Sequence, residues 1–225
     1  SFIFTMNLLT IYMKRIVVFC GSSLGFNPTY KHAAKELGAY FVQHQIGLVY
    51  GGGKIGMMGE IANSILEKNG EVIGVIPKLL EKEEVLHSGV EEMIVCKNMS
   101  ERKVIMSKMI DGYITLPGGF GTLDELFEAL TLNQLQIEQK PVGILNVNGF
   151  FDSILMQIDK MVEEGYVKPE NKNLLIVGET VNDLMSRVVS VEAPKDSSNE
   201  GRLFELLERF CTGSTSSTEI EDLLR

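Results

Sequence analysis

A glycine-rich segment, PGGFGTLDE at residues 117–125, has the residue types needed to bind a phosphate and to act on the sugar that carries it. It follows an apolar run and opens an amphipathic helical pattern, and its glycines let the backbone approach a ligand without obstruction by Cβ atoms. The unpaired N–H groups and the positive end of the helix would face the phosphate. Glu125 is then expected on the first helical turn, close to the sugar. The segment therefore predicts one site for binding and for catalysis.

Thr122 and Glu125 also fit a purely structural role at the start of the helix. In a capping box, the threonine hydroxyl would bond the backbone N–H of residue 125, and the glutamate would reach back to the N–H of residue 122. A lone Thr-x-x-Glu favours that role. The Pro-Gly-Gly-x-Gly that precedes it here reverses the preference and favours an anion site.

The composition predicts one compact domain without a basic surface. Hydrophobic residues make up 44% of the 225 residues, which is enough for a single core. The net charge of −9 and the pI near 5.0 argue against nucleic acid or an anionic membrane as the main partner. No apolar run is long enough to span a bilayer. An anionic ligand must therefore be attracted by a local site.

The cysteines and histidines show neither a disulfide nor a metal-binding pattern. Cys20, Cys96 and Cys211 are odd in number and widely separated, so they are expected to be reduced thiols in a cytoplasmic protein. The histidines, His87 among them, lack metal-ligand spacing and are expected on helix surfaces or in loops. The sequence predicts no metal site.

Short apolar runs alternate with helical patterns from residue 15 onward. The runs are β-branched without polar alternation, which is typical of strands buried on both faces. Strands are predicted at residues 15–20, 47–50, 71–76, 92–96, 112–116 and 142–146, with 174–177 as a seventh candidate, and helices at about 29–45, 57–69, 98–110, 122–136, 150–165 and 180–190. This alternation predicts an α/β fold: a Rossmann-like, doubly wound parallel sheet in three layers and a single domain.

Glycines follow the first, second and fifth of these strands. Because the carboxyl ends of parallel strands meet at one edge of a sheet, the three loops are expected to line one cleft. Ser22 would present its hydroxyl and N–H groups to a ligand. Gly52 and Gly118 would leave room for its phosphate or sugar.

Two of the glycine loops match other known motifs only in part. GSSLG at residues 21–25 has the pattern of a nucleophile elbow, but no Asp lies between Ser23 and the last histidine, so the expected triad is incomplete. GGGKIG at residues 51–56 has the glycine pattern of a dinucleotide site. It follows the second strand, however, and the next strand ends in Ile-Pro where an acidic residue would meet the ribose. Neither a serine hydrolase nor an NAD or FAD site is favoured.

Three segments taken together resemble the Lonely Guy (LOG) family. They are GGGKIGMMG at residues 51–59, MSERK at 99–103 and PGGFGTLDE at 117–125. The similarity runs from about residue 14 to residue 189. One departure is Ser100, where the family often has histidine.

The resemblance implies a hydrolase without metal or cofactor that cleaves the N-glycosidic bond of N6-modified AMP and works as a homodimer. The products would be the free base and ribose 5-phosphate, and the partner is a nucleoside 5′-monophosphate instead of nucleic acid or a membrane. Arg102 and Glu125 match the catalytic pair of the family. The other family positions expected to contact substrate are Glu84, Lys103, Gly119, Gly121, Thr122, Asp124 and Thr131.

Elementary chemistry agrees with these roles. Breaking a ribosyl C–N bond builds positive charge on the sugar, so a fixed carboxylate at Glu125 would stabilise the transition state or activate water. Arg102 stays protonated at neutral pH and is expected to clamp the phosphate or sugar.

Two alternatives stay open, namely a general AMP or purine-nucleotide nucleosidase and a non-catalytic module that binds a nucleotide or molybdenum cofactor. Lysine decarboxylation, an older description of the family, finds no support, because nothing marks a lysine for pyridoxal phosphate.

The ends of the chain are expected to be dispensable for the nucleotide-hydrolase domain at residues 13–191. Residues 1–12 are interpreted as an extension ahead of Met13. Residues 192–225 are interpreted as a flexible acidic tail with a weak helix, because their polar composition cannot offset the entropy of ordering. A chain of residues 13–191 should fold and hydrolyse nucleotide like the full chain, as measured by melting temperature and product chromatography. A loss of several degrees in Tm, or dissociation on a sizing column, would show that the tail is structural.

Overall fold

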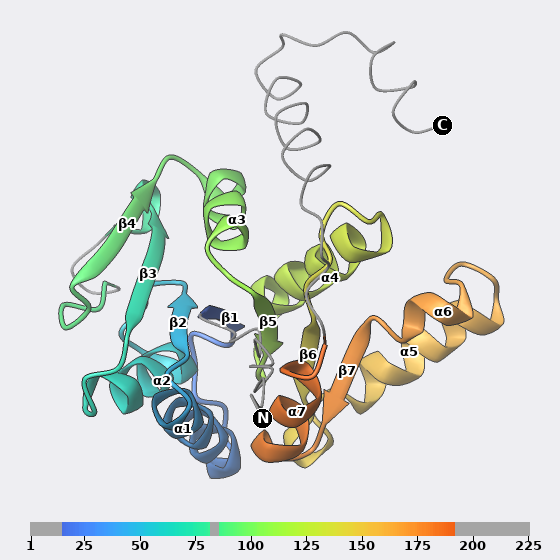
Figure 1. The fold of residues 1–225 in the computed structure, drawn as a ribbon, viewed down its shortest axis with the longest axis horizontal. Coiled ribbons are helices and arrows are strands. Elements are labelled where there is room, and N and C mark those ends of the chain that lie inside the picture. Colours follow the sequence, from blue (N-terminus) through green and yellow to red (C-terminus); the bar gives the residue numbers. More distant parts are fainter. Residues whose placement is uncertain (1–14, 82–85, 192–225) are drawn as a thin grey trace, which may run out of the picture.

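A computed structural model describes residues 15–81 and 86–191 of the chain. In this part of the chain, seven parallel strands form one sheet in the order β4-β3-β2-β1-β5-β6-β7 (Figure 1). The strands are β1 (Arg15–Phe19), β2 (Gly47–Tyr50), β3 (Val72–Pro77), β4 (Glu92–Cys96), β5 (Gly112–Thr115), β6 (Val142–Leu145) and β7 (Leu175–Gly178). The predicted doubly wound parallel sheet is therefore confirmed.

Helices cover both faces of the sheet and complete the three layers. They are α1 (Pro28–Gln43), α2 (Gly56–Leu66), α3 (Met99–Lys108), α4 (Phe120–Gln134), α5 (Asp152–Glu163), α6 (Pro169–Lys172) and α7 (Val181–Val188), with short 3₁₀ turns at η1 (Lys78–Leu80) and η2 (Val147–Gly149). One core lies between the sheet and α1, α2 and α7, and the other lies beneath α3, α4 and the start of α5. Helix α6 was not predicted, because a single turn that begins at a proline is too short to show a periodic pattern.

The central strand β1 shows how an unbroken apolar run supplies both cores. Ile16 and Val18 point into the core with α1, α2 and α7, whereas Val17 and Phe19 point into the other. Successive side chains of a strand alternate between faces, so each of these residues is buried. Strand β1 pairs with β2 on one side and β5 on the other. The strand order reverses here, which makes the carboxyl ends of β1 and β5 the expected ligand position.

Helices α3 and α4 begin in different ways. Asn98 caps α3, since its Oδ1 accepts a hydrogen bond of 2.9 Å from the N–H of Glu101. Helix α4 has Gly119 at its N-cap and no side-chain cap among the described residues. The capping box considered for Thr122 and Glu125 is therefore wrong. Because α4 begins at Phe120, Thr122 lies buried inside the helix, and Glu125 lies on the second turn instead of the predicted first.

The remaining sequence expectations have mixed outcomes. Cys20 and Cys96 are free, buried thiols as predicted, while Cys211 and both terminal segments lie outside the described residues. His87 lies in a loop, as expected, but its side chain is buried. Its Nδ1 accepts a hydrogen bond from the N–H of Gly89, and its Nε2 bonds Oδ1 of Asn63, so both ring nitrogens have partners. Burial lowers the pKa of His87 and favours this neutral form. In the described ranges we find no helix long and apolar enough to cross a membrane.

Candidate active site

The three glycine loops meet at the carboxyl edge of the sheet, as the sequence predicted. The N–H of Gly21 donates to the carbonyl of Pro117 at 3.0 Å, and the N–H of Met57 donates to the carbonyl of Gly21 at 3.1 Å. A Cβ atom on Gly118 would lie 2.8 Å from the backbone nitrogen of Gly21. The loops after β1 and β5 therefore touch at the position where the strand order reverses.

Two glycines of the second loop are required by close contacts. Gly56 has a φ of +65°, and a Cβ there would lie 2.2 Å from the carbonyl carbon and oxygen of Ser22. Gly51 faces α3, and its Cβ would lie 2.3 Å from Nη2 of Arg102. Gly52 has a φ of +76° and turns the chain between these contacts. The loop is thus shaped to admit a guanidinium beside the sheet edge.

Arg102 of α3 and Glu125 of α4 form the centre of the site. Nη1 of Arg102 donates to Oε1 of Glu125 at 3.0 Å, and its Nε donates to the carbonyl of Val75 at 3.0 Å. Each of the two charged side chains is only 11% exposed. A buried ion pair of this kind is held in one geometry because each charge lacks water and needs the other.

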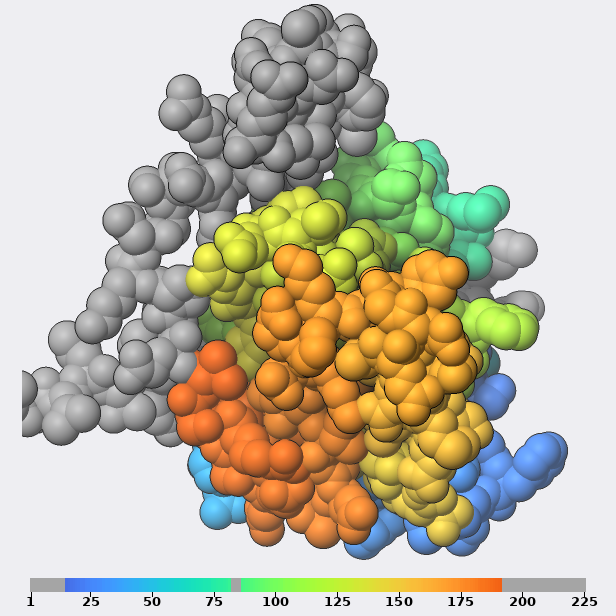
Figure 2. All heavy atoms as spheres, turned by 90° about the vertical axis from the view of Figure 1, so that its right-hand side faces the viewer, coloured from blue at the N-terminus to red at the C-terminus, as the bar shows by residue number. Residues whose placement is uncertain are grey.

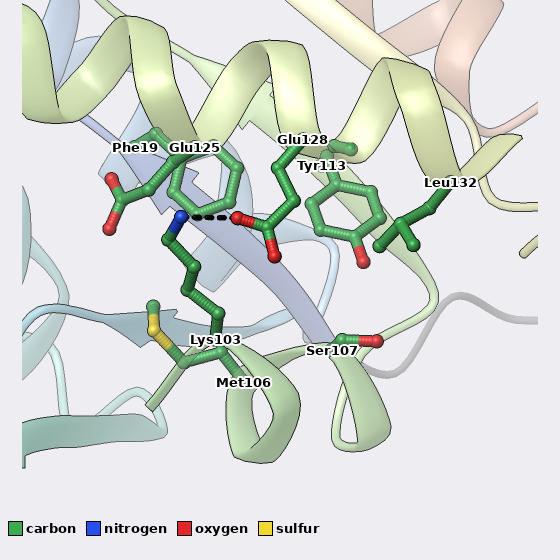
Figure 3. Close-up of a pocket in the computed structure, with 9 residues that line it drawn as sticks. Phe19, Lys103, Met106, Ser107, Tyr113, Glu125, Glu128 and Leu132 are labelled. Carbon is green, nitrogen blue, oxygen red and sulfur yellow. Dashed lines mark hydrogen bonds and ion pairs between the residues drawn. The ribbon is translucent and has the colours of Figure 1, made fainter. Parts of the chain in front are cut away.

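Lys103 forms a second, adjacent connection between the same two helices. Its Nζ lies 2.7 Å from Oδ2 of Asp124 and also bonds the carboxylate of Glu128, toward which it points in Figure 3. Burial would lower the pKa of Lys103, but the bonds to these two carboxylates together raise it. Lys103 therefore stays charged and adds to the positive potential around Glu125.

The electrostatic balance at Glu125 suits a group that exchanges protons or stabilises positive charge. Burial raises the pKa of Glu125, Arg102 and Lys103 lower it, and the neighbouring carboxylates Asp124 and Glu128 raise it again. The net shift is upward. A carboxyl group with a raised pKa can accept or release a proton nearer to neutral pH than an exposed glutamate can.

The first turn of α4 presents an open N-terminus beside this pair. A Cβ on Gly119 or Gly121 would meet nothing within 4 Å, so a ligand can come close to the backbone at both positions. A Cβ on Gly118 would instead lie 2.1 Å from the hydroxyl oxygen of Thr122. Uncapped N–H groups at the positive end of a helix favour an anion.

A small cavity lies between α3 and α4 next to the ion pairs (Figure 3). Its volume is about 20 Å³, roughly the space of one water molecule. Its lining is Phe19, Lys103, Met106, Ser107, Tyr113, Glu125, Glu128, Ala129 and Leu132. In the described part of the chain, no group of three His, Cys, Asp or Glu side chains is arranged to hold a metal ion.

Most of the sequence-predicted site residues converge, and one described residue does not. Lys103 and Asp124 form an ion pair beside Glu125. The three meeting loops and the first turn of α4 contain the other predicted residues, namely Ser22, Gly52, Gly118, Gly119, Gly121 and Thr122. Thr131 lies further along α4, is exposed, and lines a different cavity with α5, α6 and β7. Glu84 lies outside the described residues.

Sequence reasoning missed two residues that shape the site. The sequence places Gly51 in a glycine-rich motif, but its role in making room for Arg102 depends on a distant helix and was not predicted. Glu128 binds Lys103. The sequence did offer a sign of this contact, because Asp124 and Glu128 lie four positions apart and therefore on the same face of the helix.

Fold and site together define an open-sheet α/β protein with its ligand position at the carboxyl edge of the sheet. A family described as "Possible lysine decarboxylase" matches residues 58–188. Cytokinin riboside 5′-monophosphate phosphoribohydrolase LOG1 of Arabidopsis thaliana is 46% identical over 175 residues, which cover 78% of this chain and 82% of that protein. The homologous enzyme LOG7 of the same plant is 39% identical over 207 residues, covering 91% and 95%.

Solved structures with the same fold are more distant in sequence. The molybdenum cofactor carrier protein of Chlamydomonas reinhardtii has a TM-score of 0.59 at 23% identity, covering 78% of this chain and 95% of that one. The molybdenum cofactor binding protein of Rippkaea orientalis has a TM-score of 0.60 at 22% identity, covering 79% and 96%. These likenesses concern the fold alone. The chain belongs to the LOG family of phosphoribohydrolases, and it is an enzyme of the N-glycosyl hydrolase type.

We expect Arg102→Ala to destabilise the fold in a pH-dependent way, because it leaves the buried Glu125 without its cation. The pKa of Glu125 is already raised by burial, so the folded state favours the protonated carboxyl, and this contribution to stability is lost as the pH rises through the folded-state pKa. Removing Arg102 raises that pKa further. The cost should therefore be small at acid pH and reach about 3 kcal/mol at neutral pH, as measured by chemical denaturation.

The matched control for this prediction is the same substitution in a Glu125→Gln background. An amide has no charge to leave unpaired, so the cost of Arg102→Ala should no longer grow with pH. A cost that is equal at pH 5 and pH 7 in the wild-type background would contradict the assignment of the pair as a buried, charged contact.

Proposed function

We propose that this chain hydrolyses N6-modified AMP to the free base and ribose 5-phosphate. The single observation that carries the proposal is the buried Arg102–Glu125 pair, 3.0 Å apart, next to the open N-terminus of α4. A carboxylate with a raised pKa beside an anion site has the parts that the cleavage of a phosphorylated riboside needs. The relatives named for this activity support the same substrate class.

The phosphate of the substrate would bind at the first turn of α4. Gly119 and Gly121 leave open space there, and the helix dipole favours a negative group. Ser22 lies in the neighbouring loop with its side chain exposed, so its hydroxyl is available to the same ligand. Anchoring the phosphate would hold the ribose close to Glu125, so that the two reacting groups stay in a fixed relative orientation.

The chemistry follows from the charge that develops on the sugar. As the C1′–N bond breaks, the bonding electrons leave with the base and the ribose becomes positively charged, so the carboxylate of Glu125 stabilises this state. Water adds its hydroxyl group to C1′, and its other proton passes by way of Glu125 to the departing base. Glu125 can accept that proton because its pKa is raised. Arg102 keeps Glu125 oriented and contributes charge, but it does not act as an acid.

The direct test is to incubate the protein with AMP and with isopentenyladenosine monophosphate and to follow free base and ribose 5-phosphate by chromatography. Release of base from the N6-modified nucleotide alone supports the proposed specificity. Equal release from both would indicate a general AMP nucleosidase, and no release from either would contradict the proposal.

Glu125→Gln should lower kcat by at least about 100-fold while nucleotide binding changes little, because the amide keeps the shape and removes the charge. Turnover and calorimetric binding of AMP would be compared with those of the wild type. Asp183→Asn is the matched control, because it removes a carboxylate on α7, which packs in the other core, and it should leave kcat unchanged. Turnover of Glu125→Gln within about threefold of wild type would exclude the electrostatic role.

We also propose that the active form is a cytosolic homodimer in which Thr131 reaches the site of the partner subunit. Thr131 matches a substrate-contacting position of the family, yet in this chain it is exposed and bonds the carbonyl of Phe127, away from Glu125. It lines a cavity between α4 and the surface formed by α5 and α6, the face that Figure 2 presents. A second copy would bring this position to the substrate. The free thiols support a reducing compartment.

Mixing two inactive variants tests this arrangement. Thr131→Arg and Glu125→Gln should each be inactive alone, because one blocks the site and the other removes its carboxylate. In a mixed dimer, one site combines the intact Glu125 of one chain with the intact Thr131 of the other, so random exchange should restore about one quarter of the wild-type activity. Mixing Glu125→Gln with Arg102→Ala should restore none. If neither mixture recovers activity, Thr131 acts in the site of its own chain.

A further inference from the structure

Helix α3 carries both Arg102 and Lys103 but has few apolar contacts of its own. Within the helix, only Met106 and Ser107 are buried, and Val104 is 40% exposed. An element with little buried apolar surface is free to shift unless other contacts fix it. The precise position of Arg102 against Glu125 must therefore come from polar contacts along α3.

A buried carboxylate at the far end of α3 supplies such contacts. Glu138 is 2% exposed and accepts hydrogen bonds from the hydroxyls of Ser107 on α3 and Tyr113 on β5. Nζ of Lys140 lies 3.8 Å from the Glu138 carboxylate and donates to the carbonyl of Ser107 at 2.8 Å. Figure 3 shows Ser107 and Tyr113 at the opposite end of the gap from Glu125. The proposed reaction does not use this cluster.

The turn that carries Glu138 is itself fixed to α4. Oδ1 of Asn133 accepts from the N–H of Lys140 at 2.9 Å, and its Nδ2 donates to the carbonyl of Ala129 at 2.9 Å. The N–H of Ile137 donates to the carbonyl of Leu132 at 2.9 Å. Glu138 therefore moves with α4, and its bond to Ser107 connects α4 to α3.

Two polar connections thus join α3 to α4, one on each side of a small cavity. Arg102 and Lys103 bind Glu125, Asp124 and Glu128 at one end, and Ser107 binds Glu138 at the other. One connection alone would leave the helix free to pivot about it, whereas two fix both its distance and its rotation. The cavity between them has a volume of about 20 Å³.

We propose that Glu138 is a positioning residue for the hydrolysis: by binding Ser107 and Tyr113 it sets α3 so that Arg102 meets Glu125 in the reactive geometry. This inference rests on the proposed function. A carboxylate suits the task because it only accepts hydrogen bonds, and both of its hydroxyl partners can donate. Glutamine would keep the shape but turn one acceptor into an N–H₂ group, so one hydroxyl would have to turn and accept instead of donating, and the negative charge that faces Lys140 would be lost.

The test is a double-mutant cycle between Glu138→Gln and Arg102→Ala. Glu138→Gln should lower kcat about tenfold with KM changed less than about twofold, because a small shift of α3 misplaces the catalytic pair after substrate is bound. In the Arg102→Ala background the same substitution should change the small residual kcat, measured at high enzyme concentration, less than about twofold, because no guanidinium is left to misplace. A purely structural role would lower activity by the same factor in both backgrounds, and this result would overturn the inference.

Asn146→Ala is the matched control for a buried polar contact that does not involve α3. Asn146 is also buried, and its amide bonds Asp152 and the N–H of Phe151, each at 2.8 Å. Its loss should lower Tm like Glu138→Gln but leave kcat per folded protein unchanged. If Glu138→Gln does not fold, Tyr113→Phe removes a single bond to the carboxylate and should lower kcat in the same Arg102-dependent way.

The failure of the proposed function can be told apart from the failure of this inference. If the wild type is active and the Glu138→Gln variant is fully active, the inference is overturned but the proposed function is not. A wild type that releases no base would contradict the proposed function. The inference would then be decided by the same cycle measured on unfolding midpoints, where additive shifts of Glu138→Gln and Arg102→Ala would overturn it.

Discussion

The structure of the site depends on one buried ion pair, Arg102 with Glu125. Both side chains are largely removed from water, and neither charge is stable there without the other. The pair therefore imposes requirements on its surroundings. Gly51 must lack a side chain, Val75 must offer its carbonyl to the Nε–H of the guanidinium, and α3 must stay at a fixed distance from α4. Each of these features is explained by the need to keep two opposite charges paired in a poorly solvated position.

The same pair links the fold to the chemistry. A parallel sheet brings the loops after β1, β2 and β5 together at its carboxyl edge, and the glycines there allow backbone segments to touch. That contact leaves the start of α4 uncapped and open toward an anion, one turn before Glu125. In the reaction that we propose, the phosphate site at this N-terminus and the carboxylate that stabilises the sugar cation would be about one helical turn apart.

Polar contacts, more than apolar packing, determine where α3 lies. The core residues fix the sheet and α1, α2 and α7, whereas α3 contributes to its core one buried apolar side chain, Met106, and the partly buried Ile105. Its position is set by ion pairs at its first half and by the Glu138 cluster at its second. This arrangement has a physical advantage for catalysis, because directional bonds specify a rotation as well as a distance, and apolar contacts alone do not.

The sequence by itself determined the order of strands and helices, the parallel sheet, the three glycine loops and the family, because these follow from local periodicity and from contiguous motifs. It also misplaced the start of α4, since the pattern Thr-x-x-Glu is the same whether the helix begins at Phe120 or at Thr122. Only the tertiary structure decided that Arg102 pairs with Glu125, that Thr131 points away from them, and that Glu138 bonds Ser107. These contacts join segments that are distant in sequence, and their geometry arises only when α3 and α4 pack on the same face of the sheet.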